Sequence, residues 1–183
     1  MTKTFLKQKG NYKDLIAFQK ATCIYDVTYY FAHKFFYRGD RTIDQMVQAA
    51  RSGKQNIAEG CSAGTTSSET EIKLINVAKA SLQELLLDYE DYLRVNNLKQ
   101  WPLNSKKNIE IRKMCYTNND TSYYKVIILK SDSETIANIA ITLIHQVDVL
   151  LRKLIDSLQD SFIKEGGIRE QMSKARMDYK RKF

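Results

Sequence analysis

Apolar residues recur at intervals of three and four along most of the chain, which is the spacing of one face of an α-helix. The pattern predicts helices over residues 12–37, 41–60, 68–98 and 132–164. In the second of these, the apolar face consists of Ile43, Met46, Val47, Ala50, Ile57, Ala58 and Cys61. The third and fourth carry the apolar seams that line contacts in helical bundles. We therefore expect an all-α protein.

Polar residues and glycines near the ends of these segments predict where the helices begin and end. Thr42 with Gln45, and Ser68 with Glu71, have the spacing of a capping box, in which a side chain at the helix start accepts a backbone hydrogen bond. Gly60 is predicted to be the C-cap of the second helix, because glycine enters the left-handed conformation without steric cost.

The fourth predicted helix starts near Ser131, with Glu134 three residues on, and Gly166 ends it. Before it, residues 103–130 are irregular: "SKKNIEIRKMCY" indicates a short helix, whereas "YYKVIILK" fits either a strand or a helical lead-in. Four long amphipathic helices with short first connections favour an antiparallel up-and-down four-helix bundle over residues 12–165. A basic connector then joins helices three and four, and a basic suffix follows.

The sequence holds few residues of the kinds that enzymes and metal centres use. His33 and His145 lie on different predicted helices, and neither follows a glutamate at the spacing of di-iron bundles. Cys23, Cys61 and Cys115 are odd in number and form no C-x-x-C pair, which argues against zinc and against a disulfide framework. We expect no catalytic residues, no metal and no cofactor.

The start of the chain lacks an apolar run of signal-peptide length, and no stretch of about 18 consecutive apolar residues follows. These features predict a cytoplasmic protein without a membrane partner.

The net charge of +8 is unevenly distributed along the chain. Residues 1–20, 99–130 and 166–183 carry +4, +5 and +4, whereas residues 68–98 and 131–165 each carry −3. Basic ends and a basic connector suit a polyanionic partner. A solvated surface that keeps the protein soluble accounts for the same charges.

A family resemblance rests on two neighbouring stretches. Ala49-Ala50 and "NIAEG" (56–60), followed by "SSETEIKLINVAKASLQEL" (67–85), resemble the four-helix-bundle proteins encoded in intervening sequences of bacterial 23S ribosomal RNA genes. The same superfamily includes the accessory variability protein of diversity-generating retroelements. The ending "GGIREQMSKAR" (166–176) is similar to the family version with a C-terminal suffix. Family members commonly carry Arg or Lys in the loop after "AEG", where this chain has "CSAGTTS".

The resemblance implies an oligomeric bundle, with a pentameric ring as the expected form. It also implies that the protein binds nucleic acid, RNA rather than DNA. A reverse transcriptase is the protein partner that the resemblance suggests. Gly53 would let a neighbouring helix approach closely, while Asn56 and Glu59 would tie the end of the second helix to the third or to a neighbouring subunit. Gly60, Ser68 and Glu71 complete this motif of packing and capping.

Candidate phosphate contacts are basic residues near the first turn, on the second helix, in the connector and in the suffix: Arg38, Arg41, Arg51, Lys54, Lys106, Lys107, Arg112, Lys113, Arg169, Lys174, Arg176, Lys180, Arg181 and Lys182. Such contacts give affinity without sequence readout. Tyr123 and Tyr124, beside Lys125, either stack on unpaired bases or pack in the core. The alternative function is a structural assembly protein with a protein partner, whose charge serves only solubility.

Overall fold

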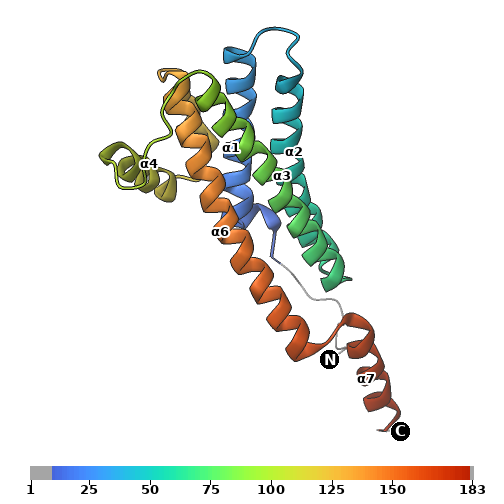
Figure 1. Cartoon of the computed structure of the whole chain (residues 1–183). Coiled ribbons are helices and arrows are strands. Elements are labelled where there is room, and N and C mark those ends of the chain that lie inside the picture. The colour runs from blue at the N-terminus through green and yellow to red at the C-terminus, as the bar shows by residue number, and fades with distance from the viewer. Residues whose placement is uncertain (1–9, 182–183) are drawn as a thin grey trace.

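A computed structural model describes residues 10–181, and every regular element in that range is a helix (Figure 1). The chain runs through η1 (Tyr12–Asp14), α1 (Ile16–Phe35), α2 (Arg41–Ala63), α3 (Ser68–Val95), α4 (Lys106–Thr117), α5 (Thr121–Ile128), α6 (Ser133–Glu165) and α7 (Ile168–Lys180). The expectation of an all-α protein is confirmed over these residues.

The four long helices pack side by side, and the shorter ones attach to them. α1 packs against α2 and α6, and α3 packs against the same two helices. α4 lies against α6 and α5 against α1 (Figure 1). The predicted contact between the second and third long helices is therefore present.

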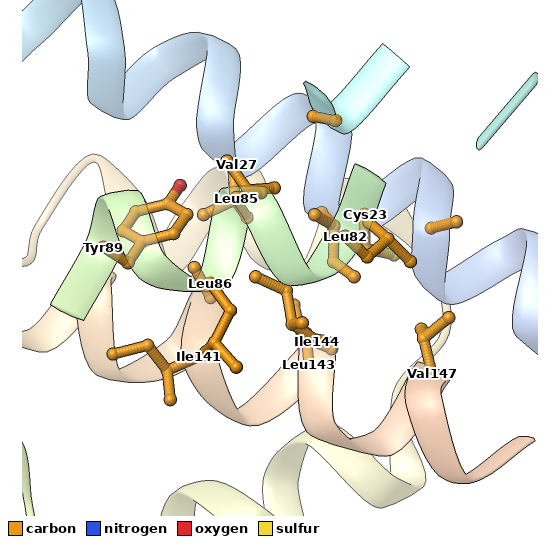
Figure 2. Packing of buried hydrophobic residues seen from close by; sticks show 14 of the residues in the cluster. Cys23, Val27, Leu82, Leu85, Leu86, Tyr89, Ile141, Leu143, Ile144 and Val147 are labelled. Atoms are coloured by element: carbon orange, nitrogen blue, oxygen red, sulfur yellow. The ribbon is translucent and has the colours of Figure 1, made fainter. Parts of the chain in front are cut away.

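Much of the core lies where α1, α3 and α6 meet, and Met46, Ala50 and Ile57 of α2 belong to the same cluster. Figure 2 shows side chains from the three helices turned toward one another: Cys23 and Val27 from α1, Leu82, Leu85, Leu86 and Tyr89 from α3, and Ile141, Leu143, Ile144 and Val147 from α6. Burying one Leu or Ile side chain contributes about 1.5–3 kcal/mol. Of the apolar face predicted for α2, Met46, Ala50, Ile57 and Cys61 are buried, whereas Ile43, Val47 and Ala58 are partly buried.

Three helices begin at other caps than those predicted. The N-caps are Asp40, Ser67 and Asp132, whose side chains accept the backbone N–H of Thr42 (2.8 Å), Thr70 (3.1 Å) and Thr135 (2.8 Å), respectively. A cap needs extended backbone, which all three adopt. Thr42 and Ser68 are already helical, so the capping boxes predicted from Thr42–Gln45 and Ser68–Glu71 are wrong by one or two residues.

The helix ends also differ from the predicted bounds. The segment predicted as one helix over 12–37 is interrupted at Leu15, whose extended ψ of 123° separates η1 from α1. α3 ends at Val95, before the left-handed Asn97 (φ 54°). Gly166, with φ 73°, closes α6 as predicted, because only glycine adopts that conformation without strain.

The connector between α3 and α6 is helical and is fastened to α6. Residues 103–130 contain α4 and α5, so "YYKVIILK" is helical up to Ile128, ends in a turn and forms no strand. The indole N–H of Trp101 donates to Glu134 Oε1 (2.8 Å), and the Trp101 backbone N–H donates to Asn138 Oδ1 (2.8 Å). Glu134, which sequence placed at a helix start, therefore anchors the connector.

The suffix forms α7, which extends beyond the end of α6 (Figure 1). Ile168 and Gln171 in its first half lie beside the loop 64–67 between α2 and α3. Within residues 10–181 it packs broadly against none of the other helices. Most of its surface therefore faces outward.

One lysine and two cysteines are buried where the connector meets α1. The Lys20 ammonium donates to the carbonyl oxygen of Cys115, and the thiol of Cys23 donates to the carbonyl of Asn119 (3.4 Å). Burial lowers the pKa of Lys20 and raises the pKa of Cys23 and of Cys115 to about 12. The folded chain thus keeps both thiols protonated well above their ordinary pKa.

These shifts predict an alkaline loss of stability. Between pH 9 and 12 the folded state holds thiol protons that the unfolded chain releases, so stability falls as pH rises, by up to about 1.4 kcal/mol per pH unit for each cysteine. The lowered pKa of Lys20 has the opposite effect below about pH 10.5: stability rises with pH there, because the unfolded chain binds the lysine proton more tightly. Urea unfolding under reducing conditions at pH 8 and pH 11 should show a smaller loss for the Cys23→Ala/Cys115→Ala variant than for wild type. Equal losses would contradict this account.

Candidate nucleic-acid interface

Two glycines of α2 face α3 at close range. A Cβ at Gly53 would lie 2.7 Å from both Cγ and Cδ2 of Leu82, and one at Gly60 would lie 3.1 Å from Cδ1 of Ile75. Both glycines are buried, so they let α3 approach α2 closely. The prediction that Gly60 is a C-cap is wrong, since α2 continues through it to Ala63.

Asn56 is linked to α3 through an intermediate serine. Its amide donates to the carbonyl (2.9 Å) and hydroxyl (3.2 Å) oxygens of Ser52, whose hydroxyl pairs with that of Ser81 on α3 (2.9 Å). Glu59 is exposed and makes no hydrogen bond or ion pair to α3 within residues 10–181. The expected tie between α2 and α3 therefore runs through Ser52 and not through Glu59.

The candidate phosphate contacts occupy separate parts of the surface. Arg38 is in the α1–α2 turn; Arg41, Arg51 and Lys54 are on α2; Lys106, Lys107, Arg112 and Lys113 are on α4; Arg169, Lys174, Arg176 and Lys180 are on α7, with Arg181 next to it, while Lys182 lies outside the described residues. The α1–α2 turn and α7 lie at opposite ends of the molecule, and α4 projects to one side (Figure 1). The fold does not gather these side chains into one patch.

Among the described residues, the candidate cations stay outside the ion pairs. The ion pairs join other residues: Lys73–Glu69, Lys79–Asp148, Arg94–Asp91 and Arg152–Asp148. Two candidates lie over aromatic rings instead, Lys54 4.2 Å from the ring centroid of Tyr25 and Lys107 5.0 Å from that of Trp101. Lys107 also lies near enough to Asp132 and Glu134 to help lower the pKa of both carboxyls, whereas no ion pair occupies the other described candidates.

Acidic residues concentrate on two helices that are neighbours. α3 and α6 fall in the two segments with net charge −3, and they pack against each other. On α3, burial and the nearby carboxylates of Asp91 and Glu84 raise the pKa of Asp88. The net charge of α3 and α6 therefore repels a polyanion, whereas α2, α4 and α7 carry the candidate cations.

Nothing in the described part of the chain forms a metal centre of three or more His, Cys, Asp or Glu side chains. His33 Nδ1 lies 2.8 Å from the carbonyl oxygen of Tyr29 on its own helix, and His145 is exposed on α6. The two histidines share no site with each other.

The region 133–180 contains an 18-residue window with a mean hydropathy of 1.3, apolar enough by composition to cross a membrane. In the fold, 61% of that window is buried. Burial of this kind is also the property of a core helix in a soluble protein.

The tyrosines that line a surface hollow are not the two that the sequence analysis considered for base stacking. Tyr124 is fully buried and donates to the carbonyl of Asn118 (2.9 Å), so it packs in the core, while Tyr123 is 39% exposed. Tyr25, Tyr29 and Tyr30 of α1 instead line a surface hollow of about 470 Å³ against α5. The four-residue spacing of Tyr25 and Tyr29 could have predicted this pair from the sequence, because residues four apart lie on the same face of a helix.

Comparison with protein-family models, with curated proteins and with solved structures finds no match for this chain. The resemblance to the intervening-sequence proteins therefore stays a prediction that rests on residues 45–60 and 67–85.

Proposed function

We propose that this chain is a non-enzymatic nucleic-acid-binding protein, with RNA as its first ligand, built on an antiparallel four-helix bundle of α1, α2, α3 and α6. One observation carries the proposal: the exposed cations of α2, α4 and α7 lie outside the ion pairs of the described chain. Free cations neutralise phosphates and release condensed counterions, which supplies affinity without base readout.

Self-association completes the proposal, with a ring such as a pentamer as the expected form. The candidate cations of one chain are dispersed, so one copy offers only a few contacts to any short stretch of nucleic acid (Figure 1). Repetition around a ring multiplies them through effective concentration. Such a ring in the cytoplasm would present bound RNA to an enzyme that acts on nucleic acid, for example a reverse transcriptase.

Neutralising the suffix should flatten the salt dependence of binding. In the full chain, the triple variant Arg169→Gln/Lys174→Gln/Arg176→Gln should bind a labelled single-stranded RNA more weakly at low salt. Its plot of log affinity against log salt should lose about 0.7 of slope for each phosphate contact removed. Fluorescence anisotropy over a salt series measures both quantities.

The matched control removes the same charge from paired cations. Lys73→Gln/Arg94→Gln/Arg152→Gln alters residues that already face Glu69, Asp91 and Asp148. This variant should keep a slope close to that of wild type. Equal slopes for the suffix variant and wild type would show that α7 is not part of the interface. Absence of RNA binding by wild type would refute the proposed function.

A structural assembly protein with a protein partner is the second candidate. Large apolar side chains stay exposed on several helices, among them Leu87 (61%), Ile163 (79%) and Met172 (51%). Exposed apolar groups suit protein contacts more than phosphate contacts. Purification without retained nucleic acid, together with salt-insensitive self-association, would favour this reading.

A further inference from the structure

A hollow on the surface between α1 and α5 is lined by three tyrosines, two aliphatic residues and two charged residues. Tyr25, Tyr29 and Tyr30 form its α1 side, and Lys125 and Leu129 contribute from α5 and the residue that follows it. The hollow measures about 470 Å³ and is open to solvent. Its α1 side lies outside the basic segments, whereas Lys125, Ile128 and Leu129 belong to the basic connector 99–130.

The three tyrosines are fixed to different degrees. Tyr25 and Tyr30 are partly buried against the core, whereas Tyr29 is 50% exposed. The Tyr29 ring stacks on His33 with centroids 4.2 Å apart, and its centroid lies 6.3 Å from that of Tyr25. The Tyr29 ring is thus positioned by His33 and still half exposed to solvent, as a ring on which a nucleobase stacks must be.

Charged groups line the hollow, and one further lysine lies over a ring that lines it. The Lys54 ammonium reaches over the Tyr25 ring at 4.2 Å, and exposed Lys125 lines the α5 side. Asp26 is also one of the residues that line the hollow. Lysines attract phosphates and the carboxylate repels them, whereas a carboxylate accepts hydrogen bonds from the exocyclic amino group of cytosine.

From this arrangement we infer that the hollow between α1 and α5 binds an unpaired nucleobase of a single strand, stacked on Tyr29, with its phosphates toward Lys54 and Lys125. The inference rests on the proposed function and adds to it the strand type and the base. Paired bases in a duplex cannot enter such a hollow. Asp26 makes a cytosine, which carries an amino group, a better occupant than uracil, which has none.

The test uses the full chain and three labelled probes: a ten-nucleotide oligocytidine, an oligouridine of the same length and a double-stranded RNA. Wild type should bind oligocytidine most tightly. Tyr29→Ala should weaken single-strand binding about fivefold to a hundredfold, the range for loss of one base stacked on an aromatic ring. The salt slope should stay unchanged because no phosphate contact is lost. Asp26→Asn should narrow the preference for cytidine over uridine.

Two controls separate stacking from other effects. Tyr29→Phe keeps the ring and should bind as wild type does, and Tyr37→Ala removes a tyrosine that is 84% exposed outside the hollow and should also bind normally. Unchanged single-strand binding by Tyr29→Ala would overturn the inference and leave the proposed function standing. A smaller mass for Tyr29→Ala in light scattering would assign the hollow to a second copy of the chain and also overturn it. Absence of binding by wild type to all three probes would overturn both.

Discussion

Replacing Gly53 by leucine is expected to lower the free energy of unfolding by about 2–3 kcal/mol. The first added carbon alone would lie 2.7 Å from Cγ and Cδ2 of Leu82, which is itself buried in the core. Overpacking at such a contact costs about 1–3 kcal/mol, and a leucine places three further carbons in the same space. The better helix propensity of leucine returns less than about 1 kcal/mol.

In a thermal melt followed by circular dichroism, this loss corresponds to a fall of about 4–12 °C in Tm for a chain of this size. Gln48→Leu adds the same side chain at an exposed position of α2 and should change Tm little. A double-mutant cycle sharpens the test: Gly53→Ala should destabilise wild type but stabilise the Leu82→Ala variant, where room has been made. Equal effects in both backgrounds would show that Gly53 does not set the distance between α2 and α3.

Replacing Tyr89 by alanine should have the largest effect on stability, a loss of about 3–5 kcal/mol. The side chain is fully buried, its ring centroid lies 4.9 Å from that of Phe31 on α1, and its hydroxyl donates to Thr28 Oγ1 (3.0 Å). Alanine would leave a ring-sized cavity between α1 and α3, and it would leave the Thr28 hydroxyl without this donor.

The conservative variant divides this loss into two parts. Tyr89→Phe keeps the ring and removes only the hydroxyl, so the expected loss is about 1 kcal/mol. Tyr37→Ala, at a position that is 84% exposed, should stay within about 0.5 kcal/mol of wild type. Urea unfolding measures all three variants. A Tyr89→Ala chain as stable as Tyr37→Ala would mean that this ring does not hold the core together.

The long helices were predictable because burial is periodic. Ile75, Ala78, Leu82 and Leu85 recur every three or four residues, and all four are buried in α3. The caps were less predictable, because serine, threonine and aspartate stand together at several helix starts. Which one caps depends on which residue has extended backbone, and tertiary packing decides that.

The connector and the tyrosine hollow depend on contacts between segments far apart in the chain. "YYKVIILK" is apolar enough for a strand or a helix, and its packing against α1 selects the helix. Tyr124 and Tyr29 look alike in sequence, yet one is fully buried and the other half exposed. Gly60 resembled a C-cap because the close approach of α3 cannot be seen from α2 alone.

The central claim, binding to nucleic acid through phosphate contacts, is tested most directly by one salt titration. Full-length protein is titrated into labelled single-stranded RNA at a series of salt concentrations, and log affinity is plotted against log salt. We expect a straight line with a negative slope of about 0.7 per contact, which exceeds about 2 when three or more cations of α2, α4 and α7 take part. No binding at the lowest salt, or an affinity that does not change with salt, would contradict it.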